Sequence, residues 1–474
     1  MPHSDSANRW LALYVLCAGV LMIVLDTTIV NVALPSIRED LKFTETSLVW
    51  VVNAYMVTFG GFLLLGGRLG DLLGHRRTFL GGLAFFTLAS VACGLAGSQA
   101  VLIGARAIQG IGGAIVTAVA LSLIMNMFTA PADRAKAMGI YGFVCSAGGT
   151  IGTLLGGFLT TALNWHWIFL VNLPIGAVVY FFCLRLIAAS THQNTEARLD
   201  VAGVAAVTAA SMLGVYAIVN GRELGWTSTA TMGMLGTAAA LLAAFLMIES
   251  RVRHPLMPLA MFRLRNVATA NVVGVLWAAS MFAWFFISAL YMQLVLGYTP
   301  MQVGLGFLPA NLIMAAFSIG LSARIVMRFG IRIPLAAGLL LAAAGLALFA
   351  RARVDGTFPV DVMPGMTLLG LGAGLALNPV LLAAMSDVDP ADSGIASGVV
   401  NTSFMLGGAL GLAVLASLAG ARTEALAVWG ADPRIALTGG YHAAFAAGAV
   451  FAVIAAAAGG LVIRASALPA HDSA

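Results

Sequence analysis

The segment LALYVLCAGVLMIVLDTTIVNVAL, Leu11–Leu34, is apolar enough and long enough to cross a membrane as a single helix. At about 1.5 Å per residue, it spans the roughly 30 Å of hydrocarbon in a bilayer. One carboxylate, Asp26, lies inside this segment, and a charge at that depth costs about 3 kcal/mol or more. Asp26 is therefore predicted to be a functional, proton-titrating group. The alternative is a structural aspartate capped by Thr27, Thr28 or Asn31.

Similar apolar stretches recur along the whole chain of 474 residues. Hydrophobic residues make up 61% of it and charged residues only 9%, against roughly 25% charged residues in soluble domains. Fourteen candidate spans lie near residues 11–34, 48–67, 78–97, 100–124, 138–162, 167–187, 201–219, 230–248, 268–292, 303–323, 334–350, 362–386, 395–418 and 441–463. Because unpaired backbone groups are too costly in lipid, these spans are expected to be helices. The predicted fold class is an all-α polytopic membrane protein with 14 transmembrane helices.

The basic residues predict the orientation of these spans. If the N-terminus is cytoplasmic, 16 of the 24 lysines and arginines fall in inner segments and 7 in outer segments, with Arg106 inside a span. Basic residues concentrate on the cytoplasmic side of membrane proteins, so both termini are predicted to be cytoplasmic. The net charge of +5 then reflects topology, and no nucleic acid is expected as a partner. Abundant arginine and alanine are typical of a GC-rich bacterial gene. A cytoplasmic (inner) membrane is the expected location.

Two segments recur in the second half of the chain at nearly the same spacing. Pro131–Arg134 (PADR) returns as Pro390–Ser393 (PADS), 259 residues later, and Gly67–Arg77 has a weaker echo at Ala323–Arg332, 256 residues later. Such parallel repeats are typical of transporters built from two related bundles. The sequence predicts two pseudo-symmetric six-helix bundles with a two-helix hairpin, spans seven and eight, inserted between them. The predicted parts are residues 9–190, the hairpin with its cytoplasmic linkers at 191–255, and residues 256–466.

The inner loop between spans two and three, Gly67–Arg77 (GRLGDLLGHRR), combines a carboxylate, basic side chains and glycines. Glycine permits the tight turns of such a loop. An acidic group beside a helix N-terminus and arginines can form contacts in one conformation that break in another. We therefore predict a conformational gate, and the alternative is a basic membrane anchor with an incidental aspartate. The predicted gate residues are Gly67, Asp71, Gly74, Arg76 and Arg77.

Span four contains a basic residue, Arg106, at a depth where arginine is uncommon. Arginine stays protonated, so it cannot carry a transported proton itself. It can stabilise the ionised form of a nearby carboxylate and be released when that carboxylate is neutralised. Asp26 is the expected partner, and the two are the predicted proton-coupling residues. The alternative is that Arg106 extends toward the membrane surface.

Span five carries Gly148, Gly152 and Gly156 at four-residue spacing, with Gly157 beside them, a pattern that lets two helices approach closely. Span nine is rich in aromatic residues at mid-span, whereas lipid-facing aromatics usually concentrate at the interfaces. A polarisable wall of this kind suits hydrophobic or cationic ligands, although core packing explains it nearly as well. The predicted substrate-cavity residues are Asn31, Asn53, Tyr55, Gln109, Trp277, Trp284, Phe285 and Asn378.

Together these segments resemble the fourteen-span drug:proton antiporters of the major facilitator superfamily, the bacterial multidrug and quaternary-ammonium exporters. Leu25–Pro35 is similar to the first-span motif of that family, whose aspartate is associated with proton coupling. Gly67–Arg77 resembles its gating loop, and Leu102–Ala114 resembles its span-four arginine motif. Gly152–Gly157 (GTLLGG) is similar to the antiporter motif, and Trp165–Pro174 (WHWIFLVNLP) also matches the family. The resemblance covers nearly the whole chain.

Two positions depart from the family pattern. Thr153 stands where the antiporter motif has proline, which predicts a straighter helix, and Leu72 stands where the gating loop has an arginine after Asp71. The weaker echo of the loop has Met327 at the position of Asp71, so the full gate is expected only in the first bundle.

The resemblance implies a proton-driven antiporter that exports hydrophobic or cationic drugs by alternating access. Its expected partners are small-molecule substrates, protons and the lipid bilayer, and we expect a monomer. No enzyme motif, metal site or cofactor is predicted, and the proton gradient is the expected energy source. The alternatives are a dedicated exporter of one metabolite or antibiotic, and a proton-coupled uptake symporter, which would need a more polar cavity. The sequence leaves open whether Glu223 takes part.

Overall fold

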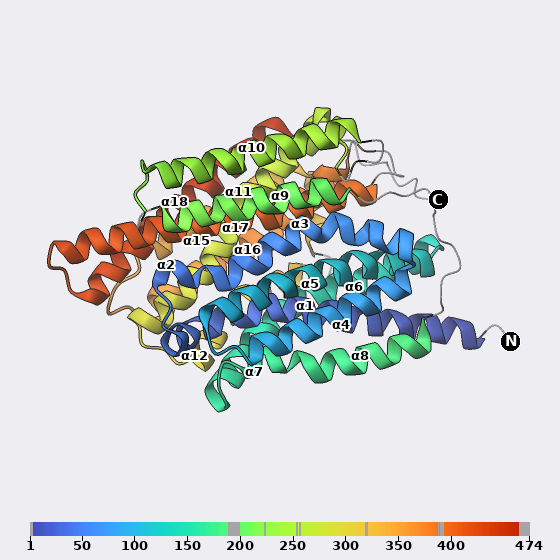
Figure 1. Ribbon diagram of the computed structural model, residues 1–474, viewed down its shortest axis with the longest axis horizontal. Helices are drawn as coiled ribbons and strands as arrows, with labels where there is room; N and C mark the ends of the chain where they lie inside the picture. Colours follow the sequence, from blue (N-terminus) through green and yellow to red (C-terminus); the bar gives the residue numbers. More distant parts are fainter. Residues whose placement is uncertain are drawn as a thin grey trace. The chain divides into compact units, whose positions relative to one another are not determined.

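The computed structural model of the chain (Figure 1) describes residues 3–187, 200–221, 224–252, 255, 257–317, 321–386, 388 and 393–463. Within these ranges, thirteen helices are long and apolar enough to cross a membrane, and Pro300–Ala316 is a shorter apolar segment. The predicted class, an all-α polytopic membrane protein, is confirmed. The predicted span at 303–323 differs from the others, because two helices, α12 (Pro300–Gly306) and α13 (Leu308–Ala316), share that stretch.

The helices fall into two compact units, residues 1–256 with 285–308, and residues 257–284 with 309–474. The first unit holds α1 (His3–Leu41), α2 (Glu45–Leu48), α3 (Trp50–Leu73), α4 (His75–Gly94), α5 (Gln99–Met127), α6 (Pro131–Ala162), α7 (Trp167–Leu170), α8 (Asn172–Leu186), α9 (Val201–Asn220), α10 (Thr229–Arg251), a π-helical turn (Tyr291–Val295) and α12. The second holds a 3-10 turn (Leu259–Arg263), α14 (Ser322–Phe329), α15 (Arg332–Phe349), a π-helical turn (Phe358–Val362), α16 (Met363–Met385), α17 (Ser393–Val428) and α18 (Pro433–Val462). The boundaries between the units fall within α11 (Arg265–Leu290) and at the start of α13.

Polar side chains and prolines mark several of the helix starts. Ser98 accepts a hydrogen bond from the backbone N–H of Val101 at the start of α5, and Ser228 does the same for Thr231 at the start of α10. Pro131 occupies the first turn of α6, where a missing N–H costs nothing. These local signals explain why the long apolar runs break into separate helices where they do.

Close helix packing holds the core of the first unit together. The helix α1 packs along α6, while α3 and α4 both pack along α5. Glycine makes these approaches possible: a Cβ added at Gly112 of α5 would lie 2.6 Å from the backbone nitrogen of Phe86 in α4. In the second unit, α15 packs along α16 and α18, and α17 packs along α18.

Within the first unit, the helices α9 and α10 form a hairpin that packs against α3, and both are drawn in green in Figure 1. The contact runs through α3, where Trp50 lies 6.2 Å from Tyr216 between ring centroids. Further along α3, a Cβ added at Gly61 would meet the hydroxyl of Thr208. The division into parts at 9–190, 191–255 and 256–466 stays a prediction, because residues 188–199 lie outside the described ranges.

Candidate proton-coupling site

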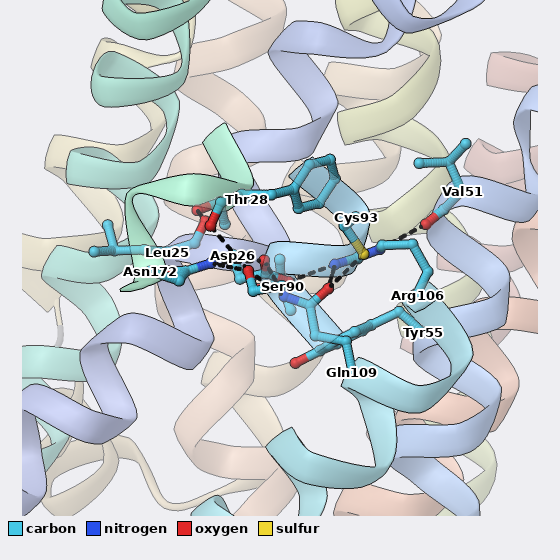
Figure 2. A network of polar contacts seen from close by, with 12 residues as sticks. Leu25, Asp26, Thr28, Val51, Tyr55, Ser90, Cys93, Arg106, Gln109 and Asn172 are labelled. Carbon is cyan, nitrogen blue, oxygen red and sulfur yellow. Dashed lines mark hydrogen bonds and ion pairs between the residues drawn. The ribbon is translucent and has the colours of Figure 1, made fainter. Parts of the chain in front are cut away.

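Asp26 lies in the middle of α1 and bonds to side chains from α5 and α8 (Figure 2). Its Oδ2 pairs with Nη1 of Arg106 at 2.5 Å. Both residues are only 1% exposed. The structure therefore brings the two predicted proton-coupling residues into direct contact, and their role in coupling stays a prediction.

Arg106 is fixed on several sides besides its pairing with Asp26. Its Nε donates to the backbone carbonyl of Val51 at 2.9 Å, and its Nη1 donates to Oε1 of Gln109 at 2.7 Å. Its guanidinium carbon lies 4.3 Å from the centroid of the Tyr55 ring and 5.6 Å from that of Phe169, as in cation–π contacts. The alternative in which Arg106 extends to the membrane surface is wrong, because the whole side chain is buried among these groups.

The second oxygen of Asp26 faces two amide side chains. Its Oδ1 accepts from Nε2 of Gln109 at 2.7 Å and from Nδ2 of Asn172 at 3.2 Å. Both amides also donate to the hydroxyl of Ser90, at 3.1 and 2.9 Å, and that hydroxyl donates to the backbone carbonyl of Phe169 at 3.0 Å. All of these side chains are buried, so Asp26 is enclosed in a polar network inside an apolar bundle.

A break between two helices gives Asn172 its position. The short helix α7 ends at Leu170, and α8 begins at Asn172 without a side-chain cap. The first turn of a helix carries unpaired N–H groups and partial positive charge, which favour an anion. Discontinuous helices that direct their ends at a buried charge are common at the binding sites of membrane transporters. The start of α8 thus places the side-chain amide of Asn172 against the Asp26 carboxylate.

The alternative in which neighbouring polar residues cap Asp26 is also wrong. The hydroxyls of Thr27 and Thr28 donate to the backbone carbonyl of Val24 at 2.8 and 3.0 Å. The amide of Asn31 donates to the carbonyl of Thr27 at 3.3 Å. These groups satisfy the backbone of their own helix, and the partners of Asp26 come from α5 and α8.

Three of the four predicted antiporter glycines line the contact between α6 and α1, within one turn of Asp26. A Cβ added at Gly152 would clash with Oγ1 of Thr28, and one at Gly156 would lie 2.7 Å from the carbonyl of Ile29. Gly148 faces Val24 in the same way. Gly157 instead faces the carbonyl of Pro300 in α12. These glycines thus let α6 lie directly on the helix that carries the buried carboxylate.

Thr153, which replaces the proline of the antiporter motif, bonds to its own helix. Its hydroxyl donates to the carbonyls of Gly149 and Thr150 at 3.2 and 3.1 Å. The helix α6 runs without interruption from Pro131 to Ala162. An uninterrupted helix is what the loss of the proline predicts, since proline removes a backbone donor and bends a helix.

The predicted gate residues lie around the junction of α3 and α4. Gly74 separates the two helices with φ +89°, a conformation that favours glycine. Nη2 of Arg76 donates to the carbonyl of Leu184 in the last turn of α8 at 2.7 Å. Arg77 lines an open cleft of about 440 Å³ with Leu69, Leu72 and other residues of α3, α4 and α5. A Cβ at Gly67 would meet nothing within 4 Å.

The side chain of Asp71 and the whole of Glu223 lie outside the described residues. The gating role of the loop therefore stays a prediction. What the structure adds is a tie between this loop and α8, the helix whose other end bonds to Asp26.

Comparison with known proteins decides the family. The family model described as Major Facilitator Superfamily matches residues 16–412. The chain belongs to the major facilitator superfamily. The chain is 37% identical over 438 residues to the puromycin resistance protein of Streptomyces alboniger, covering 92% of this chain and 87% of that protein. It is 38% identical over 424 residues to the cephamycin export protein of Amycolatopsis lactamdurans, covering 89% and 87%.

Solved structures support the same fold for this superfamily member. The crystal structure of the nucleoside transporter NupG matches with a TM-score of 0.68 and 13% sequence identity. The match covers 96% of this chain and 100% of that one. An identity this low bears on the fold alone. The predicted superfamily and the predicted multi-pass membrane architecture are both confirmed.

The predicted substrate-cavity residues of this transporter divide between the two units. In the first unit, Gln109 belongs to the Asp26 network and Tyr55 lies over Arg106. Asn53 is fully buried, and within the described residues its amide has no hydrogen-bond partner, while Asn31 bonds to its own helix. Phe285 stacks on Phe307 with centroids 5.3 Å apart.

The remaining cavity residues lie in the second unit. Trp277 and Trp284 of α11 are both fully buried, and Asn378 of α16 is partly exposed. Burial of the two tryptophans fits the core-packing alternative as well as a cavity wall. A common cavity lined by residues of both units stays a prediction.

Two members of the Asp26 network are absent from the sequence predictions. Asn172 lies inside the segment Trp165–Pro174 that resembles the family pattern. A polar residue at the start of span six is the sequence feature that could have identified it. No feature of the sequence singles out Ser90, because a lone serine in an apolar helix usually bonds to its own backbone. Only the packing of α4 against α5 and α8 shows that its hydroxyl joins the network.

Proposed function

We propose that this chain is a proton-coupled antiporter that exports hydrophobic or cationic compounds, antibiotics among them, across the cytoplasmic membrane. The observation that carries the proposal is the fully buried Asp26–Arg106 pair in a superfamily member whose relatives are named for antibiotic resistance and export. A titratable group enclosed in a membrane bundle is the kind of site through which protons are coupled to transport. We also propose cytoplasmic termini and a monomer.

The proposed coupling follows from the charge of the pair. With Asp26 ionised, the pair is neutral overall, and each charge has hydrogen-bond partners. Protonation of Asp26 leaves Arg106 buried without a counter-charge, and breaking a buried ion pair typically costs about 3–5 kcal/mol. Two conformations of a transporter differ by only a few kcal/mol, so this change is large enough to shift their populations. Protonation from the outer side would release substrate, and proton loss to the inside would reset the site.

A dedicated exporter of one antibiotic is the second candidate. It is favoured by the two relatives just described, each named for a single antibiotic, puromycin in one case and cephamycin in the other. The two candidates share the same coupling site and differ only in the breadth of substrates. A drug-susceptibility panel in an efflux-deficient bacterium that expresses this chain separates them: protection against several unrelated compounds supports the first, and protection against one supports the second.

Proton coupling is tested with Asp26→Asn in proteoliposomes that carry an imposed pH gradient. The parent is expected to move substrate against its concentration gradient and to move protons in the opposite direction. The variant is expected to lose both, because it keeps the shape and loses the titratable charge. Glu39→Gln is the matched control, since it removes an exposed carboxylate from the same helix and should leave transport unchanged. Uphill transport by Asp26→Asn at the parent rate would refute the coupling role.

A further inference from the structure

The three side chains that bond to Asp26 all act as hydrogen-bond donors. Arg106 donates to Oδ2, and the amide groups of Gln109 and Asn172 donate to Oδ1. This arrangement suits an ionised carboxylate, whose two oxygens only accept. A protonated carboxyl group carries an O–H that needs an acceptor. Proton uptake by Asp26, which is the proposed function, therefore requires one neighbour to change from donor to acceptor.

Gln109 is held in its present orientation. Its Oε1 accepts from Nη1 of Arg106 at 2.7 Å and from the thiol of Cys93 at 3.6 Å. Arginine has no acceptor atom, so turning this amide over would place two donors against each other. Gln109 can therefore not offer its oxygen to Asp26 while Arg106 stays in place.

Among the residues that the structure describes, no arginine bonds to the amide of Asn172. The amide nitrogen of Asn172, Nδ2, donates to both Asp26 and Ser90. A half-turn of this amide would bring the amide oxygen of Asn172 to the same two partners. That oxygen would accept the new O–H of Asp26. It would also offer the hydroxyl of Ser90 an acceptor in place of the carbonyl of Phe169. The hydroxyl can change acceptor by rotating about its Cβ–Oγ bond.

We propose that Asn172 and Ser90 form a relay that reports the protonation of Asp26 to α7. A proton from the outer solution forms an O–H bond at Oδ1 of Asp26, the amide of Asn172 turns over, and Ser90 leaves the carbonyl of Phe169. No other covalent bond changes. This inference rests on the proposed function of Asp26, and it makes Asn172 and Ser90 positioning residues for the coupling step.

The segment that receives the signal is a short turn with few internal bonds. The amides of Phe169 and Leu170 both bond to the carbonyl of His166 at 3.2 Å, and that of Val171 bonds to the carbonyl of Trp167 at 3.0 Å. At its start, the ring of His166 bonds to the carbonyl of Gly94 at 2.9 Å. Ser90 ties the other end of the turn to α4, so its departure would loosen the segment that links α6 to α8.

Several charged or titratable groups face Asp26 from the surrounding helices. They are Arg106 of α5, Tyr55 of α3 and Cys93 of α4. The helix α6 presents glycines at this level, and α8 presents Asn172. Phenol and thiol groups ordinarily have pKa values of about 10 and 8.5. A pH response of α7 that Asp26→Asn abolishes therefore reports Asp26.

The relay is tested by hydrogen exchange of the amides in residues 166–171, measured in purified full-length protein at a high and a low pH. Each rate is divided by the intrinsic rate of an unprotected amide at that pH. In the parent, protection is expected to fall about two- to tenfold at low pH, the range expected for loss of one hydrogen bond. Asp26→Asn is expected to remove this pH response.

Two variants separate the relay from a general loosening of the bundle. Ser90→Ala should give low protection of α7 at both pH values, because the bond to Phe169 is lost permanently. Asn172→Leu should give high protection at both, because Ser90 then has no amide oxygen to turn to. Ser90→Thr, which keeps the hydroxyl, should restore the response. Thr87→Val is the matched control: it removes a buried α4 hydroxyl that bonds to its own helix, at the carbonyl of Leu83, and should respond like the parent.

The infrared band of a protonated carboxyl group, compared between the parent and Asp26→Asn, shows independently whether Asp26 takes up a proton. Uptake without a change of protection in α7, or a parent-like response in Asn172→Leu, overturns the relay and leaves the proposed function standing. If Asp26 takes up no proton between the two pH values, the proposed function fails, and the relay fails with it.

Discussion

At the scale of single residues, the main feature is a buried ion pair whose two members depend on each other. Asp26 and Arg106 are enclosed together, and each is only 1% exposed. The attraction between two such charges offsets the cost of taking each out of water, so removing one leaves the other buried and uncompensated. Their contributions to stability are therefore expected to be strongly non-additive.

This dependence can be measured with a double-mutant cycle. Arg106→Gln should lower the stability of the purified protein by about 3–5 kcal/mol, because it leaves the Asp26 carboxylate without its cation. The double variant with Asp26→Asn should recover much of this loss, since neither charge remains. Thermal unfolding in detergent gives the four values. Arg251→Gln, an exposed arginine at the end of α10, should have little effect. Losses that simply add would show that the pair is not coupled.

At the scale of helices, the contact between α1 and α6 controls how the carboxylate is held. The glycines of α6 face the turns of α1 on either side of Asp26, with Gly148 against Val24 and Gly152 against Thr28. A side chain at these positions would push α6 away from α1. The predicted spacing of small residues thus corresponds to a real close approach, at the helix that carries the site.

Gly152→Ala is expected to destabilise the protein or disturb transport, because its Cβ would clash with Oγ1 of Thr28. Overpacking of this kind typically costs about 1–3 kcal/mol. Gly139→Ala, on the same helix but with nothing within 4 Å of the added Cβ, should be neutral or stabilising. Combining Gly152→Ala with Thr28→Ala should recover part of the loss. Equal effects of the two alanine variants in thermal unfolding and transport assays would argue against a close α1–α6 contact.

At the scale of the whole molecule, the coupling site and the hairpin are built from different parts of the chain. The network uses α1, α3, α4, α5, α7 and α8. The hairpin α9–α10 packs on the outside of this set through α3. Trp50 and Gly61 mark this contact, with Tyr216 and Thr208 opposite them.

Deletion of about 200–251, rejoined by a flexible linker, is therefore expected to leave the Asp26 network and substrate binding largely intact. Two helices are removed together, so the following helices keep their orientation in the membrane. Some loss of stability is expected, because the deletion removes the packing partners of Trp50 and of the other α3 residues that face α9. Membrane insertion and binding of a fluorescent substrate provide the measurement. A chain that inserts normally and binds nothing would show that the hairpin forms part of the binding site.

The sequence alone was sufficient for the class of fold and for the two residues of the buried pair. Hydropathy over some 20 residues is a local property, and only a helix satisfies its backbone within a membrane, so the spans follow directly from composition. Asp26 and Arg106 stand out for the same reason, since any charge at that depth needs a partner. The glycine spacing of α6 likewise indicates a close helix contact, without identifying the partner helix.

The tertiary structure was needed to show which side chains share the site. Ser90 and Asn172 are unremarkable in their own helices, and their hydrogen bonds to Gln109 and Asp26 join positions as much as 146 residues apart. The sequence predicted Gln109 as a cavity residue, which stays a prediction, and only the packing shows that it bonds to both Asp26 and Arg106. Polar side chains on apolar helices can satisfy themselves locally or across a contact. Which of the two happens depends on how the helices pack, and no local pattern of residues encodes it.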